Sequence, residues 1–167
     1  MGYREHKKHA VKNVNCAVLT VSSTRTKETD ESGKFILSEL EKNNHNVIFY
    51  EVIRDDKKMI RDTIMKLVYN ENIQAIISNG GTGIGKKDFT ADTVEELLDK
   101  RLEGFGEIFR YLSYKEIGSA SIMSRAVAGV IKNTIIISLP GSIGAVKLAM
   151  KKIVIPELGH MVWEVNR

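Results

Sequence analysis

Short apolar runs that alternate with amphipathic segments constrain the fold of this chain more than any other feature. The runs are five to seven residues long and rich in β-branched side chains, which is typical of strands buried on both faces. The segments between them carry apolar side chains at helical spacing. This alternation predicts a three-layer α/β/α domain around a mostly parallel sheet. The predicted strands are residues 16–21, 47–53, 74–78, 127–131 and 134–139, and the last two form a hairpin at an edge of the sheet.

Capping residues and proline predict where the helices begin. The first helix starts near Ser32, and the last starts at Pro156. Residues 103–124 show a less regular pattern. The predicted caps are Asp55 or Asp56 for the second helix, Asp92 with Glu95 at capping-box spacing for the third, and Ser142 after the final strand.

A glycine-rich loop follows the third predicted strand. Residues 80–90 read Gly-Gly-Thr-Gly-Ile-Gly-Lys-Lys-Asp-Phe-Thr. Glycines let backbone N–H groups converge on an anion without Cβ atoms in the way, and the following helix adds its positive end. The loop therefore predicts a phosphorylated ligand. The alternative is a flexible turn that binds nothing, although turns seldom need four glycines with a carboxylate behind them.

Two known phosphate-binding motifs fit this loop only in part. The pattern G-x-x-x-x-G-K runs from Gly80 to Lys86, but Lys87 stands where a P-loop needs Ser or Thr to hold magnesium. Gly81 and Gly83 open a dinucleotide fingerprint, but Lys86 occupies its third glycine position. Both motifs are therefore disfavoured.

The net charge of +4 is concentrated at the amino terminus, where the first twelve residues contribute +3. We expect residues 1–14 to form a basic, mobile tail and residues 15–167 to form one domain. The tail lacks the aromatic interleaving of single-strand binders, so no nucleic-acid partner is expected. His6 and His9 lack a third ligand and make a poor metal site.

The remaining composition indicates a soluble cytoplasmic protein. Hydrophobic residues make up 43% of the chain and charged residues 28%. No apolar run approaches the roughly 18 residues of a membrane span, and no signal peptide is recognisable. We therefore expect no membrane partner. Cys16, the single cysteine, lies in a predicted strand and is expected to be a packed thiol.

Four polar loops follow predicted strands and are expected at one edge of the sheet, because the carboxyl ends of parallel strands meet there. Ligands of such folds bind at that edge. The loops are residues 22–26, 54–56, 80–90 and 140–142.

Several short motifs occur in a specific order along the chain, in and beside these loops. They are Thr-Val-Ser-Ser at 20–23, Gly-Gly-Thr-Gly at 80–83, Asp88 two residues before Thr90, Gly-Phe-Gly-Glu at 104–107 before Phe109 and Arg110, Ser-Arg-Ala-Val-Ala-Gly-Val at 124–130, and Leu-Pro-Gly-Ser at 139–142. In order and spacing they resemble the MoaB/MogA family of molybdenum-cofactor biosynthesis proteins, related to the G domains of gephyrin. The resemblance covers residues 15 to about 157 and is greater to the MoaB branch.

The resemblance implies molybdopterin adenylyltransferase activity, in which the terminal phosphate of molybdopterin attacks the α-phosphorus of ATP in the presence of Mg²⁺. It implies Asp55 and Asp88 as the catalytic residues. Carboxylates beside phosphates repel them unless a metal lies between, so these two are expected to hold Mg²⁺ and orient the triphosphate. Residues expected to bind phosphate, pterin or nucleotide, or to support those loops, are Ser22, Gly80, Gly81, Thr82, Gly83, Glu107, Ser124, Gly141 and Ser142.

Alternatives remain open at this stage. Arg110 and Arg125 pair either with phosphate or with structural carboxylates. A non-catalytic protein that holds molybdopterin, or that partners another molybdenum-cofactor enzyme, would need the glycine loop but not both Asp55 and Asp88.

An aromatic cluster predicts self-association. Residues 105–114 hold four aromatic side chains, spread around more than one helix face, so part of the cluster stays exposed unless a neighbour covers it. The resemblance implies trimers or hexamers. We expect the interfaces to include this segment, with Phe109 and Tyr111 among the contacts.

Overall fold

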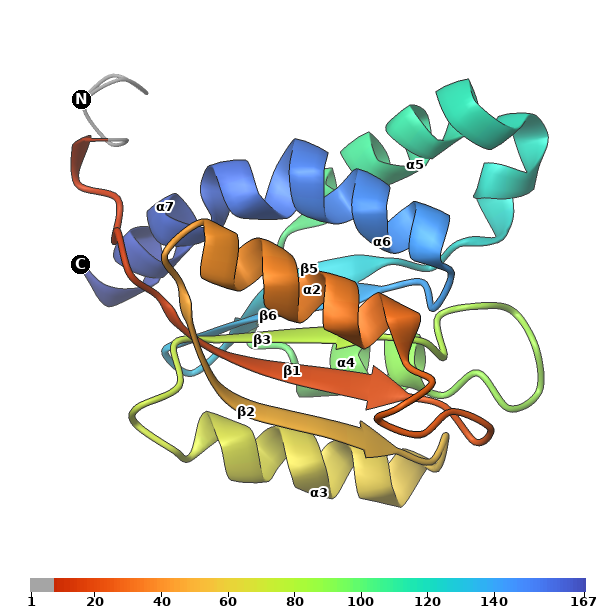
Figure 1. Cartoon of the computed structure of the whole chain (residues 1–167), viewed down its shortest axis with the longest axis horizontal. Helices are drawn as coiled ribbons and strands as arrows, with labels where there is room; N and C mark the ends of the chain where they lie inside the picture. The colour runs from red at the N-terminus through yellow and green to blue at the C-terminus, as the bar shows by residue number, and fades with distance from the viewer. Residues whose placement is uncertain (1–7) are drawn as a thin grey trace.

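The computed structural model describes residues 8–167, which form one six-stranded sheet with helices on both of its faces (Figure 1). In chain order the elements are β1 (Asn15–Val21), α2 (Glu31–Lys42), β2 (Asn46–Ile53), α3 (Lys57–Val68), β3 (Ala75–Asn79), α4 (Thr90–Leu97), β4 (Lys100–Arg101), α5 (Glu103–Ile117), the 3₁₀ helix η1 (Gly118–Met123), β5 (Val127–Ile131), β6 (Thr134–Leu139), α6 (Ile143–Ala149), the π-helical segment η2 (Met150–Val154) and α7 (Ile155–Asn166).

The strands lie in the order β2-β1-β3-β6-β5-β4. β1 pairs in parallel with both β2 and β3, and β3 pairs in parallel with β6. β5 is the antiparallel partner of β6 in a hairpin that turns at Lys132, where φ is 54°. The mostly parallel sheet and its hairpin are therefore confirmed, and the two-residue strand β4 adds an edge beyond the hairpin.

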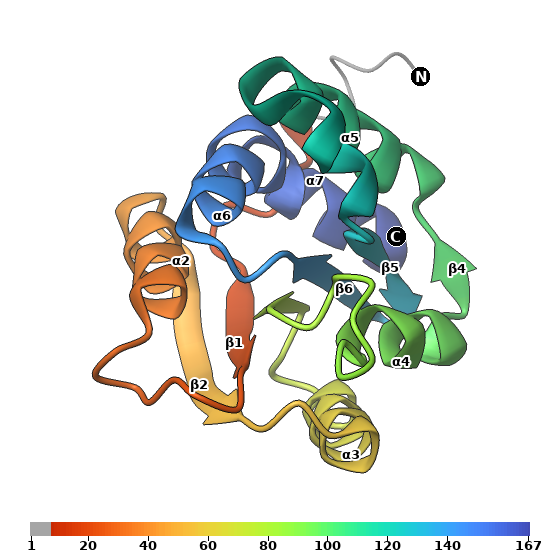
Figure 2. The ribbon, with the colours of Figure 1, turned by 90° about the vertical axis from the view of Figure 1, so that its right-hand side faces the viewer.

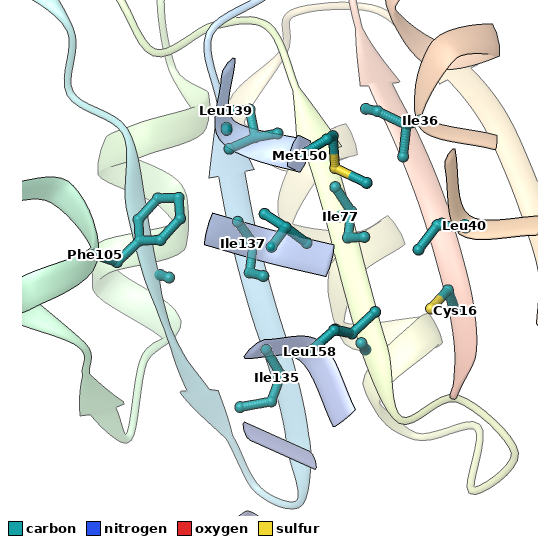
Figure 3. Close-up of a cluster of buried hydrophobic side chains, with 14 of the residues drawn as sticks. Cys16, Ile36, Leu40, Ile77, Phe105, Ile135, Ile137, Leu139, Met150 and Leu158 are labelled. Carbon is teal, nitrogen blue, oxygen red and sulfur yellow. The ribbon is translucent and has the colours of Figure 1, made fainter. Parts of the chain in front are cut away.

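Helices α2, α5, α6 and α7 lie on one face of the sheet, and α3 and α4 lie on the other (Figures 1 and 2). Successive side chains of a strand point to opposite faces. Along β3, Ile77 belongs to the cluster under α2 and α7, whereas Ile76 belongs to the cluster under α3. Figure 3 shows the first of these clusters. Each such side chain contributes about 1.5–3 kcal/mol when buried, which explains why the strands are continuous apolar runs.

Two of the predicted helix caps are confirmed and one is wrong. Ser142 caps α6, since its side chain accepts the Ala145 N–H. Asp56 caps α3, since its side chain accepts the Met59 N–H. The capping box predicted for α4 is wrong, because the cap residue is Phe89 and no side chain of the helix caps it. Asp92 pairs instead with Arg125.

The stretch expected to be irregular is a 15-residue helix, α5, followed by η1. Its two sides differ: Phe105 and Phe109 are buried, whereas Tyr111 and Tyr114 are exposed. The expectation that Phe109 contacts a neighbouring subunit is therefore wrong, because that ring belongs to the core. The last two predicted helices, α6 and α7, are continuous through η2.

Part of the predicted tail is packed against α7. The Val11 N–H donates to the Gly159 carbonyl at 3.0 Å, and the His9 ring stacks on Trp163 with centroids 5.2 Å apart. A Cβ on Gly159 would stand 2.1 Å from the Val11 oxygen, so glycine permits this close approach. Residues 8–14 thus form an arm in contact with α7, and the mobility of the tail stays a prediction. Arg4, His6 and the rest of residues 1–7 lie outside the described residues.

Cys16 is fully buried in β1. Burial raises the pKa of its thiol to about 12, so the predicted packed thiol is confirmed. Within residues 8–167, every helix falls short of the length and apolar character needed to cross a bilayer.

Candidate functional site

A cavity of about 740 Å³ lies at the carboxyl ends of the parallel strands, which point to the right in Figure 1 and toward the viewer in Figure 2. Its volume is in the range of small-molecule sites. All four polar loops predicted to meet at this edge contribute to it, and the junction between η1 and β5 contributes a fifth side. The lining comprises residues 21–25, Asp55, residues 80–83 and 85–88, Met123, Ser124 and residues 140–142.

Nearly all of the predicted site residues meet in this cavity. Both aspartates line it, together with the first-loop serine, the glycine motif and the later serines. Glu107 does not: it lies on the exposed side of α5 and is absent from the lining. The predicted residues brought together are Ser22, Asp55, Gly80, Gly81, Thr82, Gly83, Asp88, Ser124, Gly141 and Ser142.

Two glycines at the end of β3 are required by the backbone. Gly80 has φ of 95° and Gly81 has φ of 68°, a region that strains residues with a Cβ. A Cβ on Gly80 would stand 2.1 Å from the Val21 oxygen, and one on Gly81 would stand 2.2 Å from Oγ1 of Thr90. The chain therefore turns out of the sheet against neighbouring atoms, which only glycine allows.

The carboxylate of Asp88 folds back into the glycine loop. Its Oδ2 accepts the Gly85 N–H at 2.7 Å, and a Cβ on Gly83 would stand only 2.8 Å from the same oxygen. The Gly85 amide of this loop is therefore bonded to Asp88. The small glycines give the carboxylate the room to sit at the cavity wall.

Asp55 lies at the amino-terminal end of α4. Its Oδ1 accepts the Phe89 N–H at 3.2 Å, so Asp55 caps α4 from the loop that precedes α3. Burial, and secondarily the nearby charge of Asp88, raises the pKa of Asp55 above its ordinary value, although the Phe89 bond acts in the opposite direction. Because Asp56 caps α3, capping that helix is not the role of Asp55.

Both arginines left open by the sequence are engaged with protein groups. Arg125 donates to the carbonyls of Gly83 at 2.9 Å and Asp88 at 3.1 Å, and pairs with Asp92 at 2.6 Å. Arg110 donates to backbone carbonyls at the start of β5. Arg125 therefore ties the glycine loop to β5.

Three cations on the cavity wall were not singled out as site residues by the sequence. Arg25 follows the first loop serines, donates to the Gly141 carbonyl at 3.0 Å and lies 3.8 Å from the buried Asp30 carboxylate. Lys86 and Lys87 line the cavity from the glycine loop. Their position in loops that follow parallel strands is the signal that could have identified them. A wall with three cations suits a polyanionic ligand.

The carboxylates of Asp55 and Asp88 fit a magnesium ion. Mg²⁺ prefers hard oxygen ligands, and it is commonly held by one or two carboxylates together with substrate phosphates. Here two carboxylates are close enough for the charge of one to raise the pKa of the other, a repulsion that a divalent cation relieves. No group of three or more His, Cys, Asp or Glu side chains suited to a metal exists among residues 8–167. Substrate oxygens would therefore complete the coordination.

The fold and this cavity define a class: an α/β domain with a cavity, lined by a glycine loop and by cations, beyond the carboxyl ends of its strands. The family model described as "Probable molybdopterin binding domain" matches residues 17–160. The chain belongs to this family, as the motifs of the loops predicted.

Similar proteins extend over essentially the whole chain. Molybdenum cofactor biosynthesis protein B of Bacillus subtilis is 51% identical, with 100% of this chain and 99% of that protein aligned. A crystal structure of a molybdenum cofactor biosynthesis protein B is 46% identical, with a TM-score of 0.91 over 93% of this chain and 98% of that one. The tungsten cofactor synthesizing protein MoaB from Pyrococcus furiosus is 32% identical, with a TM-score of 0.85 over 95% and 100%.

Proposed function

We propose that the protein acts in molybdenum cofactor biosynthesis and catalyses the Mg²⁺-dependent adenylylation of molybdopterin by ATP. The observation that carries this proposal is the pair Asp55 and Asp88 on the wall of one cavity, beside the glycine loop. The names of its relatives support the pathway. The carboxylate pair favours an enzyme over a binding protein, since a pterin-binding protein has no need of two adjacent acids beside a phosphate.

The proposed reaction transfers an adenylyl group between two phosphates. An oxygen of the molybdopterin phosphate forms a bond to the α-phosphorus of ATP. The bond between that phosphorus and the oxygen bridging to the β-phosphate breaks, and pyrophosphate leaves with the electron pair. The products are adenylylated molybdopterin and pyrophosphate. A phosphate monoester is largely ionised at neutral pH, so the attacking oxygen needs no general base.

The residues of the cavity supply positioning and charge. Asp55 and Asp88 would hold Mg²⁺, which when bound neutralises phosphate charge and favours departure of pyrophosphate. Arg25, Lys86 and Lys87 reduce the repulsion between the two anionic substrates. Gly81, through its lack of a side chain, lets Thr90 and the Asp55 carboxylate pack against the loop.

The test is release of pyrophosphate by purified protein given ATP, Mg²⁺ and molybdopterin. We expect Asp88→Asn to lower kcat at least about 100-fold while molybdopterin binding, measured by fluorescence, is largely retained. Asp62→Asn is a matched control, because Asp62 is an exposed aspartate on α3, paired with Lys58. It should leave turnover unchanged. Wild-type protein that binds molybdopterin but releases no pyrophosphate would contradict the enzyme and favour the non-catalytic pterin-binding alternative.

We also propose that the protein assembles as a trimer or hexamer through α5. On its outward side, Ile108 is 51% exposed, Tyr111 57% and Tyr114 59%. Ile117 and Ile122 extend this apolar surface into η1. Several exposed apolar side chains along one helix favour a protein partner, and a second copy of the chain is the simplest one.

A further inference from the structure

Thr90, the first residue of α4, carries a hydroxyl without a partner. Its side chain is fully buried, and Oγ1 forms no hydrogen bond within the described part of the chain. A buried hydroxyl without a partner costs about 1–3 kcal/mol. The surroundings of this atom therefore need an explanation.

A carboxylate oxygen borders the same small space. A Cβ on Gly81 would stand 2.2 Å from Oγ1 of Thr90 and 3.0 Å from Oδ2 of Asp55. Because Gly81 has no Cβ, no side-chain atom of that residue separates the hydroxyl from the carboxylate. The hydroxyl can donate a hydrogen bond. The ionised carboxylate has no proton to donate and can only accept.

The neighbouring groups are already engaged, which restricts what the hydroxyl can bind. The Thr90 N–H donates to the Gly81 carbonyl at 2.9 Å. The N–H of Phe89 donates to Oδ1 of Asp55. The backbone at the start of α4 is thus held in place, and the hydroxyl is the remaining donor of Thr90 next to Oδ2 of Asp55.

We propose that Thr90 is a positioning residue whose hydroxyl donates a hydrogen bond to Oδ2 of Asp55. Such charge-assisted bonds are about 2.5–2.7 Å long, and on this proposal the carboxylate rotates to bring the two oxygens to this distance. Consecutive residues of one helix turn then hold both oxygens of Asp55. Each oxygen keeps a free lone pair toward the cavity, so Thr90 sets the direction from which Asp55 meets its ligand.

The kinetic test compares Thr90→Val, which keeps the buried shape without the hydroxyl, with Thr90→Ser, which keeps the hydroxyl and loses the methyl group. It rests on the proposed function, because pyrophosphate release is measured. We expect Thr90→Val to lower kcat about 10- to 100-fold with little change in KM, and Thr90→Ser to stay near wild type. A residue that only packs would show the opposite order, because serine leaves a cavity and valine does not. That opposite order would overturn the inference.

A second measurement is independent of turnover. Crystal structures of the wild type and Thr90→Val, at a resolution that defines carboxylate orientation, should show the hydroxyl bonded to Oδ2 of Asp55 in the first and a rotated carboxylate in the second. A wild-type hydroxyl bonded to the Gly81 carbonyl, or a carboxylate unmoved in Thr90→Val, would refute the assignment. If the wild type released no pyrophosphate but these structures agreed with expectation, the proposed reaction would fail and the positioning role would stand.

Discussion

Replacing Arg125 by methionine should loosen the glycine loop while the sheet stays intact. Methionine preserves length and apolar contact but removes three interactions: the donations to the carbonyls of Gly83 and Asp88, and the pair with Asp92. Each carbonyl bond contributes about 1 kcal/mol. The side chains of the ion pair are 34% and 50% exposed, so that pair adds at most about 0.5 kcal/mol. The expected loss is therefore about 2 kcal/mol.

Amide hydrogen exchange measured by NMR separates a local loss from a global one. The N–H groups of Phe89 and Thr90 donate to Asp55 and Gly81 at the end of the loop. If the loop opens by itself, these two amides should exchange about 30-fold faster, the factor that corresponds to about 2 kcal/mol. Amides within β3 should keep their protection.

Arg101→Met is the matched control, since Arg101 is 43% exposed and pairs with Glu95 and Glu103 on the surface. We expect it to change stability by less than about 1 kcal/mol and to leave the loop amides unaffected. The reasoning would be refuted if both variants changed the exchange of Phe89 and Thr90 equally. It would also be refuted if Arg125→Met slowed or left unchanged the exchange of those amides.

Three further predictions concern assembly, the arm and pH. Tyr111→Asp should shift light scattering toward monomer without loss of fold. Phe109→Ala should instead lower the free energy of unfolding, measured in urea, by about 3–5 kcal/mol, because the Phe109 ring is buried. An active wild-type monomer at micromolar concentration would refute the assembly. Deleting residues 1–12 should cost about 1–2 kcal/mol through loss of the Val11 contacts but leave pyrophosphate release unchanged, so lost turnover in a folded truncation would contradict it. Burial lowers the pKa of His45 below 6.5. The unfolded chain therefore binds more protons, and the free energy of unfolding should fall as pH drops below that value. If the urea midpoints of His45→Gln and wild type depended equally on pH between about 7 and 5, the prediction would fail.

The sheet could be predicted because its strands are buried on both faces. Continuous β-branched runs such as the one in β6 are typical of strands that are covered by helices on both faces. The cavity followed from the same pattern, since parallel strands bring their following loops to one edge. Asp55 and Asp88, 33 residues apart in the sequence, therefore meet at a position that strand order alone determines.

The regularity of α5 could not be predicted from apolar periodicity. Phe105 and Phe109 face the core, but Ile108, Tyr111 and Tyr114 are exposed on other sides of the same helix. Apolar residues on several sides erase the 3.6-residue repeat on which the sequence argument depends. The same property supports the proposed assembly, because a helix that is apolar outside its core-facing stripe is suited to a neighbour.

The role of Arg125 is a long-range property. Its side chain meets Gly83, 42 residues earlier in the chain, because β5 runs antiparallel and therefore begins at the edge where the parallel strands end. The local sequence cannot distinguish this arginine from one that binds phosphate, since either kind of arginine can precede a strand and lie beside polar loops. The pairing direction of a single strand decides between the two.

Departures from ordinary folding rules gather around the end of β3. Gly80 and Gly81 adopt positive φ, which glycine tolerates, while Asn79 Oδ1 and Thr90 Oγ1 are buried and form no hydrogen bond with any group of residues 8–167. Nearby, Asp55 has a pKa raised by burial and by a second carboxylate. The unbonded buried oxygens and the raised pKa disfavour the folded state, whereas Asp30, Asp56 and Ser142 cap α2, α3 and α6 in the ordinary way. Unfavourable local features of this kind persist in folded proteins where a ligand relieves them or where function requires them. Their position beside the cavity therefore indicates, independently of any motif, that the cavity is where the protein acts.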